Sequence, residues 1–197
     1  NSDSLTDTIS TSTSALFKIS PEYTNTVINK TGGVIEHLPV GLAQSAGAEG
    51  YIFGGYNRFG HSNKIYSATS GSSYAVATMP VGVSGSAAAY SSFNGKIYLF
   101  GGFDSTQSYS TIWEFNPSDR TIRTMSARLP EGVVGISAAY YPPTRKIYLF
   151  GGTANNEPQS WVLEYNPATD TLVTKNTVLP IPLTHATATA AAKEPPS

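Results

Sequence analysis

Short apolar segments that end in two glycines recur along the chain. They read Tyr51-Ile-Phe-Gly-Gly55, Lys96-Ile-Tyr-Leu-Phe-Gly-Gly102 and Lys146-Ile-Tyr-Leu-Phe-Gly-Gly152, and the first glycines of successive pairs are 47 and then 50 residues apart. An uninterrupted apolar run of this length, rich in aromatic and branched side chains, is typical of a strand that is buried on both faces. The pattern therefore predicts one such strand in each of three repeating units.

Two further markers repeat with the same step. A proline that follows an apolar residue occurs at positions 39, 80, 130 and 180, with spacings of 41, 50 and 50 residues. An aromatic-Asn-Pro turn occurs at Phe115-Asn-Pro117 and again 50 residues later at Tyr165-Asn-Pro167. Self-similarity at a fixed period indicates a repeat architecture in which each repeat is one small structural unit.

Each unit is expected to contain four short strands. In one full copy these are a small-residue stretch over 86–90, the apolar run over 97–100, and two further strands over 112–115 and 121–125. Turn residues such as Asn94-Gly95 separate them. No segment of helical length shows an apolar period of 3.6 residues. The chain is therefore predicted to be all-β.

A sheet with apolar residues on both faces can bury them only between two neighbouring sheets. Repetition around an axis provides those neighbours. The strand nearest the axis then needs small side chains, which the Ala/Ser/Thr stretches 86–89, 137–139 and 186–192 supply. The glycine pairs are expected to allow positive φ and close backbone approach where the second strand ends. The pattern thus favours a ring of sheets.

With its period near 50 residues and its apolar-aromatic-Gly-Gly signature, the chain resembles the kelch-repeat family of β-propellers. The resemblance covers Leu38 to Pro180 and implies a kelch-like β-propeller of four-stranded blades. The chain departs from the family pattern at Ile122 and Leu172, where the family usually has a tryptophan. Some members of the family are copper enzymes with a cysteine–tyrosine crosslink, which this cysteine-free chain cannot form.

The strand count gives about three complete blades and one partial blade built from the two chain ends. The expected divisions are a Ser/Thr-rich segment 1–14, a propeller region 15–192 and a tail 193–197. The propeller region is divided into a partial blade 15–38, the units 39–79, 80–129 and 130–179, and an inner strand 181–192. The resemblance implies six or seven blades, so the ring is incomplete.

Four arrangements would account for the missing blades. The chain ends could share one blade of a four-bladed ring, with residues 5–13 supplying a strand. Two chains could pool half-rings into one propeller, or exposed strand edges could pair into an open polymer. The sequence could also be part of a longer protein. Completion by the chain's own terminus or by a neighbour is favoured, because each buried unsatisfied backbone group costs about 1–3 kcal/mol.

Composition limits the classes of binding partner and the cellular location that are expected. The 197 residues carry a net charge of −1, which creates no field that would attract nucleic acid. No apolar run approaches the ~20 residues of a membrane span. Charged residues make up 13% of the chain, against about 25% in typical domains, and a weakly charged surface favours self-association. The chain begins at Asn1 rather than Met and nine of its first fourteen residues are Ser or Thr, so an exported, extracellular or cell-surface protein is expected.

No catalytic residue, metal site or cofactor is expected. His37, His61 and His185 are not at metal-ligand spacing, and the absence of cysteine excludes thiolate zinc sites and thiol catalysis. No nucleophile elbow, phosphate loop or paired carboxylate occurs.

Recurring polar residues are interpreted as structural. Asp119 and Asp170 are assigned to equivalent turns, where carboxylate oxygens cap backbone N–H groups. Glu114 and Glu164 each precede the aromatic residue of the third strand, which indicates a repeated structural position.

Three polar loops that follow the glycine pairs are the candidate binding surface. They span 56–63, 103–110 and 153–160, and their equivalent positions place them on one rim of the ring. Polar residues mixed with aromatic ones are typical of interaction surfaces. The candidate residues are Tyr56, Arg58, Phe59, His61, Asp104, Gln107, Tyr109, Asn155, Asn156 and Glu157.

The sequence therefore predicts an exported, non-catalytic propeller that acts as a structural, self-assembling or protein-interaction module. Its expected partner is a further copy of itself, through the termini or exposed strand edges. The alternative is a carbohydrate- or peptide-binding propeller that uses the rim loops, and a kelch-like enzyme is the third possibility.

Overall fold

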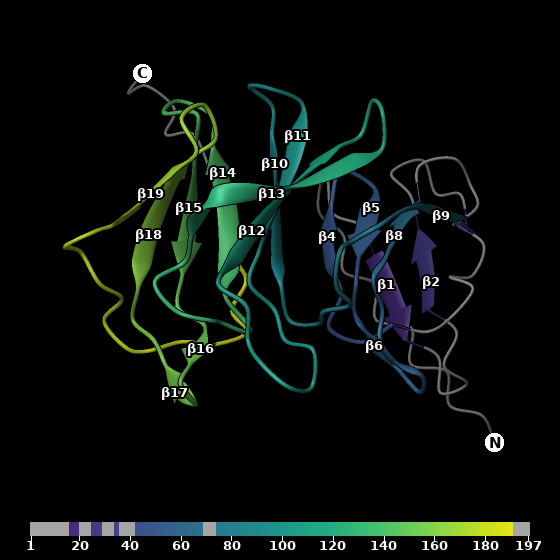
Figure 1. The fold of residues 1–197 in the computed structure, drawn as a ribbon, viewed down its shortest axis with the longest axis horizontal. Coiled ribbons are helices and arrows are strands. Elements are labelled where there is room, and N and C mark those ends of the chain that lie inside the picture. The colour runs from purple at the N-terminus through teal and green to yellow at the C-terminus, as the bar shows by residue number, and fades with distance from the viewer. Residues whose placement is uncertain (1–15, 20–24, 29–33, 36–41, 69–73, 191–197) are drawn as a thin grey trace.

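The computed structural model describes residues 16–19, 25–28, 34–35, 42–68 and 74–190. All regular secondary structure within these ranges is β-strand (Figure 1). The all-β class that the apolar pattern predicts is therefore confirmed. Over the same ranges, the chain forms no helix of the length and apolarity that a membrane span requires. The predicted segment 1–14 and tail 193–197 lie outside the described residues.

Three four-stranded antiparallel sheets follow one another along the chain, and they are called here the first, middle and last blades. The first blade contains β4 (Ala46–Ala48), β5 (Tyr51–Phe53), β8 (Lys64–Ser67) and β9 (Tyr74–Thr78). The middle blade contains β10 (Ala87–Ser91), β11 (Lys96–Phe100), β12 (Thr111–Asn116) and β13 (Thr121–Arg128). The last blade contains β14 (Ser137–Tyr141), β15 (Lys146–Phe150), β18 (Val162–Asn166) and β19 (Thr171–Thr174). Strands keep their chain order in every blade, as expected for a propeller.

Smaller sheets accompany the blades. The hairpins β6 (Tyr56–Asn57) with β7 (Gly60–His61), and β16 (Thr153–Ala154) with β17 (Glu157–Pro158), lie in the loops between second and third strands. An N-terminal sheet of β1 (Leu16–Ile19), β2 (Asn25–Ile28) and β3 (Val34–Ile35) lies within the predicted partial blade 15–38. Its three strands fall within a segment that was expected to form only part of a blade.

Strand register is the same in the middle and last blades. In the middle blade Ala89 pairs with Tyr98, and Tyr98 pairs with Glu114. The same three positions, each 50 residues further on, pair in the last blade. Because side chains alternate between the two faces of a strand, equivalent residues face the same side of each blade. The counterparts in the last blade are Ala139, Tyr148 and Glu164.

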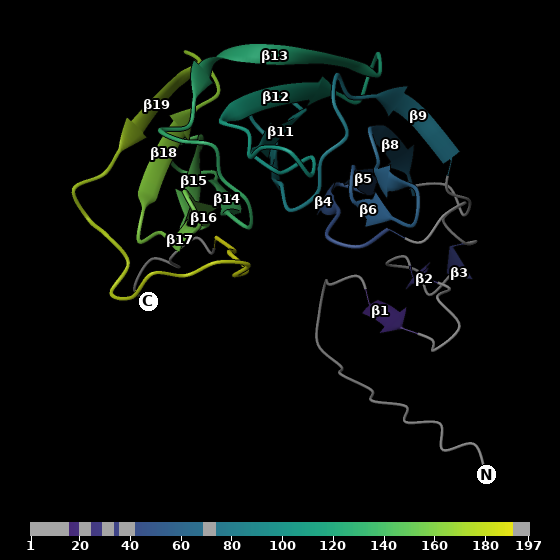
Figure 2. The same ribbon diagram turned by 60° about the horizontal axis from the view of Figure 1, so that its bottom comes forward.

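The hydrophobic core lies between blades, which fan around a common centre in Figure 2. Phe53 of the first blade packs in one cluster with Leu99 and Trp113 of the middle blade. The other face of the middle blade contributes Phe100 to a second cluster, which contains Tyr165 of the last blade. The middle blade is thus buried on both faces, which explains why its second strand has no polar alternation.

The glycine pairs are the points where one blade contacts the next. Gly101 has a φ of 66°, and a Cβ atom on it would lie 2.4 Å from the carbonyl oxygen of Val133. The N–H of Gly102 donates to that same oxygen at 2.8 Å. The pairs at 54–55 and 151–152 bind Val83 and Leu183 in the same way. The predicted role of these glycines is confirmed, because a side chain at the first glycine would separate the blades.

Four equivalent residues near the centre form a backbone belt that runs from unit to unit. Gln44, Gly85, Gly135 and His185 all have positive φ, between 53° and 68°. The N–H of Gly85 donates to the Gln44 carbonyl at 2.9 Å, that of Gly135 to the Gly85 carbonyl at 2.7 Å, and that of His185 to the Gly135 carbonyl at 2.7 Å. This axial belt explains the glycines at 85 and 135, because the position requires a positive φ, and Gln44 and His185 adopt the same backbone conformation.

The predicted inner strand over 181–192 is wrong for residues 181–190, which form no strand and are mostly exposed. Residues 191–192 lie outside the described ranges. The segment still follows the path of its counterparts, because Leu183 bonds to Gly152 and His185 to Gly135. In the middle and last blades the innermost strand pairs with the strand that follows it. Residues 181–190 have no such partner among the described residues, so the sequence pattern alone does not make a strand.

Candidate functional site

The first rim loop is the β6–β7 hairpin, and its tip is the most exposed aromatic feature described. Tyr56 is 48% exposed and Phe59 is 75% exposed. The guanidinium carbon of Arg58 lies 4.6 Å from the centre of the Phe59 ring, in a cation–π contact. The side chain of Asn57 accepts a hydrogen bond from the Phe59 N–H at 2.8 Å, which closes the turn. The predicted mixture of aromatic and polar groups is present at this tip.

His61 links the first rim loop to the second. Its Nε2 lies 2.7 Å from the hydroxyl of Ser105, and its ring meets Tyr56 and Phe103 edge to face at centroid distances of 5.0 and 5.7 Å. The Nδ1 atom is buried and has no hydrogen-bond partner among the described residues. His61 therefore acts mainly as a packing residue between two loops.

Asp104 organises the second rim loop. Its carboxylate accepts hydrogen bonds from the Thr106 and Gln107 N–H groups at 2.9 and 3.0 Å, and from the Tyr109 hydroxyl at 2.5 Å. Hydrogen bonds from Thr106 and Tyr109 hold the pKa of Asp104 well below its usual range. The same contact with Asp104 raises the pKa of Tyr109. Both predicted site residues are thus engaged within their own loop.

The third rim loop turns at Asn155 and Asn156, which adopt positive φ of 51° and 64° between β16 and β17. Both side chains are exposed and, with Gln107 and Phe103 of the second loop, line a groove of about 460 Å³. The structure therefore brings three predicted site residues together in one place. Glu157 is exposed but does not line this groove.

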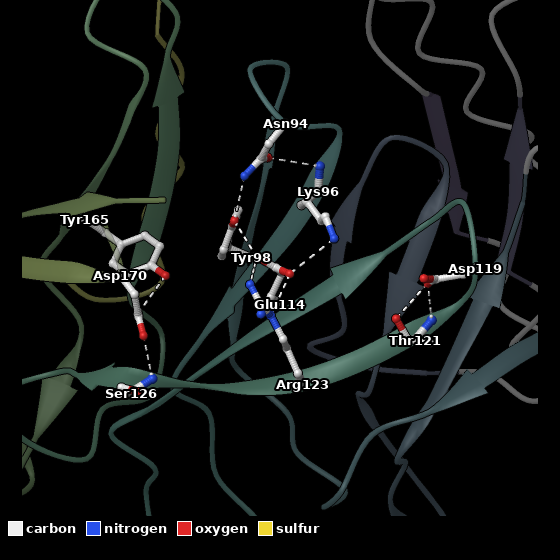
Figure 3. Close-up of polar contacts among 10 residues, drawn as sticks. All are labelled: Asn94, Lys96, Tyr98, Glu114, Asp119, Thr121, Arg123, Ser126, Tyr165 and Asp170. Atoms are coloured by element: carbon white, nitrogen blue, oxygen red, sulfur yellow. Dashed lines mark hydrogen bonds and ion pairs between the residues drawn. The ribbon is translucent and has the colours of Figure 1, made fainter. Parts of the chain in front are cut away.

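Glu114 is the centre of a polar network inside the middle blade (Figure 3). It is 4% exposed, and it accepts hydrogen bonds from the Tyr98 hydroxyl at 2.6 Å and from two guanidinium nitrogens of Arg123 at 2.9 and 3.1 Å. Lys96 adds an ion pair at 3.4 Å. Burial raises the pKa of Glu114, but hydrogen bonds from Arg123 and Tyr98 outweigh burial and lower it overall. The network is a satisfied structural element, as the repeated position indicated.

Asp119 and Asp170 are not equivalent, which corrects the sequence assignment. Asp119 caps the N–H of Thr121 at 3.0 Å within its own turn. Asp170 lies one position later in the repeat, at the positive-φ position that Arg120 occupies in the middle blade. Its carboxylate accepts a hydrogen bond from the Ser126 N–H at 2.7 Å and so reaches the neighbouring blade (Figure 3). The two turns look alike in sequence because both contain Asn-Pro followed by a nearby aspartate.

The outward face of the last blade is less covered than its counterpart in the middle blade. Tyr148, Phe150 and Val162 are only partly buried, and they are called here the free face. Glu164 lies on the same side of the sheet and binds Lys146 and Lys175, the latter at 3.1 Å. Hydrogen bonding by Lys146 lowers the pKa of Glu164. The middle-blade counterparts of the free face are fully buried, and they are Tyr98, Phe100 and Ile112.

A shallow cavity of about 290 Å³ lies on this free face. Tyr148 and Phe150 line it together with Ala139, and so do Thr189 and Ala190 of the C-terminal segment. The segment therefore covers only part of the face. Sequence reasoning did not single out these residues, because their pattern is identical to that of fully buried residues 50 positions earlier. The repeat itself carries no signal that separates the two sets, because coverage depends on which surface packs against the blade.

The part of the chain that the structure describes holds no group of three or more His, Asp or Glu side chains that could bind a metal ion. Its buried carboxylate, Glu114, is held by Arg123 and Tyr98 rather than directed into an open space. The arrangement can support binding by loops and faces, and its polar interior stabilises the blades.

Comparison with known proteins agrees with the repeat. The kelch motif matches residues 84–121, which span the middle blade from its first strand to the start of its fourth. A search of curated protein sequences returned no match. Among solved structures, the structure of YjhT is similar, with a TM-score of 0.59 and 17% identity. The likeness covers 72% of this chain and 53% of YjhT, so the matched part spans about half the length of that protein. The matched motif, the blade repeated at a 50-residue step and the likeness in fold agree with a kelch-like β-propeller fold.

Proposed function

We propose that this chain is an exported, non-catalytic structural module that works by binding protein surfaces, including those of its own copies. Kelch repeats generally mediate contacts between proteins. The observation that carries the proposal is the free face: Phe150 is partly exposed, whereas its counterpart Phe100 is 0% exposed against the next blade. An apolar sheet face of this kind is stable only when another surface covers it.

The low charge of the chain supports association between copies. With 13% charged residues and a net charge of −1, identical molecules do not repel one another strongly. Light scattering coupled to size-exclusion chromatography tests this over a range of concentrations. A mass that rises above 20.8 kDa with concentration supports self-association, and a constant monomer mass at high concentration contradicts it.

The non-catalytic part of the proposal rests on how the acidic groups are used. Glu114 is neutralised by Arg123, and Asp104 is saturated by donors of its own loop. Neither is placed to exchange a proton with a bound substrate. The export part rests on the low charge and on the Ser/Thr-rich segment 1–14. Detection of the native protein in the culture medium tests it, and retention in the cell interior contradicts it.

A second candidate function is carbohydrate or peptide binding by the rim loops. The groove between the second and third loops favours it, because the amide residues Gln107, Asn155 and Asn156 line it together with the aromatic Phe103. Amides that bind hydroxyls, next to an apolar ring, suit a small polar ligand.

A glycan array and a peptide array would test the second function. Asn155→Ala and Gln107→Ala should lose any signal, whereas Arg58→Ala, which lies outside the groove, should keep it. Blank arrays for the wild-type protein contradict this function.

A further inference from the structure

The turn between β10 and β11 carries the one Asn-Gly pair of the sequence, Asn94-Gly95. Asparagine is chemically labile, because the backbone nitrogen of the following residue can attack its side-chain amide carbon. A following glycine favours this attack, since it has no side chain that would shield the nitrogen. Gly95 has a φ of 70°, and nothing lies within 4 Å of the place that a Cβ atom would take. Every other asparagine of the chain is followed by a larger residue.

In the folded turn both reacting groups are engaged in hydrogen bonds. The Gly95 N–H, whose nitrogen would attack, donates to the carbonyl oxygen of Ser91 at 2.9 Å. The side-chain amide of Asn94 donates to the Tyr98 hydroxyl at 2.8 Å, and its oxygen accepts from the Lys96 N–H at 3.2 Å (Figure 3). Attack requires the nitrogen and the amide carbon to approach each other in a defined geometry. The reaction therefore requires the turn to open and these hydrogen bonds to break.

The contact between Asn94 and Tyr98 is part of the buried network around Glu114. The Tyr98 hydroxyl has one proton, which it donates to the Glu114 carboxylate at 2.6 Å, and it accepts from the Asn94 amide. A carboxylate at position 94 has no proton to donate, so it would place a negative oxygen against the Tyr98 oxygen. Tyr98 is 0% exposed, and its ring lies 5.4 Å from that of Tyr165 in the last blade. A chemical change at position 94 therefore acts on a residue of the contact between two blades.

We propose that Asn94 is a site of spontaneous deamidation that the folded turn restrains. The Gly95 nitrogen forms a bond to Cγ of Asn94, the bond from Cγ to Nδ2 breaks, and ammonia leaves with the Gly95 amide proton. The product is a cyclic succinimide, which water opens at one of its two carbonyl carbons. Opening gives an aspartate or an isoaspartate, whose backbone is longer by one methylene. Both products lose the donor to Tyr98 and gain a negative charge. The proposal does not depend on how copies of the chain associate.

Peptide mass spectrometry of the full chain, incubated at mildly alkaline pH with and without guanidinium chloride, tests the site. The peptide that contains Asn94 should exchange its amide for a carboxylate at least ~10-fold more slowly in the folded protein than in denaturant, because the turn must first open. Asn155 and Asn156 are the internal control. They lie in an exposed turn but are followed by Asn and Glu, so in denaturant both should react more slowly than Asn94. Equal rates at Asn94 in folded and denatured protein overturn the restraint, and no reaction at Asn94 in denaturant overturns the site.

Tyr98→Phe tests the restraint within the folded protein. The variant keeps the aromatic ring but removes the oxygen that accepts from the Asn94 amide, so Asn94 should react several-fold faster while the circular dichroism remains native. Tyr148→Phe is the matched control. It makes the same change at the equivalent position of the last blade, where residue 144 is threonine, and should leave the Asn94 rate unchanged. An unchanged rate in folded Tyr98→Phe overturns the role of this contact. If Tyr98→Phe does not fold, the comparison of folded and denatured wild-type protein decides.

Asn94→Asp reproduces one product of the reaction and tests its consequence. It should lower the thermal midpoint by about 2–4 °C, because Tyr98 loses a donor and faces a negative charge. A midpoint equal to that of the wild-type protein contradicts the link between position 94 and the buried network.

Discussion

The carboxylate of Asp170 in the last blade accepts a hydrogen bond from the backbone N–H of Ser126 in the middle blade, at 2.7 Å. A second oxygen of the same carboxylate accepts from the Tyr165 hydroxyl at 3.0 Å. Ser126 belongs to β13, the outermost strand of its blade, and the turn that carries Asp170 lies between β18 and β19. A side-chain hydrogen bond thus links the outer edges of the two blades, whereas backbone hydrogen bonds of the axial belt link their inner edges.

Removal of this outer link should destabilise the fold. Asp170→Ala should lower the free energy of unfolding by about 1–3 kcal/mol, because the hydrogen bond from the Ser126 N–H is charge-assisted and the Tyr165 hydroxyl also loses its acceptor. Asp119→Ala is the control, since Asp119 caps only its own turn, and it should cost about 0.5–1 kcal/mol. Urea unfolding measures both. Equal losses in the two variants would show that Asp170 has no role between blades.

A methyl group at the glycine pair should disrupt blade stacking. In Gly101→Ala the new Cβ would lie 2.4 Å from the Val133 carbonyl oxygen, at a φ of 66°. The expected loss of stability is at least ~3 kcal/mol, or failure to fold. Gly95→Ala has nearly the same φ, 70°, but nothing lies within 4 Å of its Cβ, so it should cost only about 1 kcal/mol. Thermal unfolding of the two variants separates steric contact from backbone strain, and similar losses would contradict the role of the close approach.

The buried Glu114 network of the middle blade should contribute more to the stability of the fold than the partly exposed Glu164 network of the last blade. Glu114→Gln removes the charge that Arg123 faces in the interior, and it should lower the free energy of unfolding by about 2 kcal/mol. Glu164→Gln in the last blade should cost about 1 kcal/mol or less, because the side chain of Glu164 is 11% exposed, against 4% for Glu114, and its charge is better solvated. Chemical denaturation of both variants provides the comparison. A larger loss for Glu164→Gln would contradict the difference in burial.

Acidification should destabilise the protein. The pKa values of Glu114 and Glu164 are lower in the folded state than the ordinary glutamate value. The unfolded chain therefore binds more protons between these values, so stability is full above about pH 5 and falls as the pH decreases through the folded pKa values. Urea midpoints between pH 7 and pH 3 should show this decline, and Glu114→Gln should flatten it. A midpoint that is constant down to pH 3 would be inconsistent with the lowered pKa values.

Features carried by the repeat could be predicted from the sequence. The Gly-Gly pairs, the Lys-Ile-Tyr-Leu-Phe strands and the third-strand Glu114 and Glu164 occupy equivalent positions in successive units. The inner strand over 181–192 was predicted wrongly for 181–190 because a strand also needs a partner, and the local pattern does not contain one. The repeat predicts which segments are able to form a strand, and the presence of a pairing segment determines whether the strand forms.

The candidate site, too, could be predicted from the sequence only in part. The sequence identified the rim loops, and the structure brings Gln107, Asn155 and Asn156 to one groove. Loop sequences do not indicate that Asp104 and Tyr109 bind each other, because side-chain pairing depends on the folded path of the loop. The sequence does not indicate the free face, because Phe150 and the fully buried Phe100 occur in the same Lys-Ile-Tyr-Leu-Phe motif.

Hydroxyl-radical footprinting with mass spectrometry tests the central claim, that the free face is the surface by which copies associate. Oxidation of Tyr148 and Phe150 is compared in dilute and in concentrated protein, with the 75% exposed Phe59 as internal reference. Tyr148 and Phe150 should become protected as the native mass doubles, while Phe59 reacts equally at both concentrations. A doubled mass with unchanged oxidation of Tyr148 and Phe150 would contradict the claim.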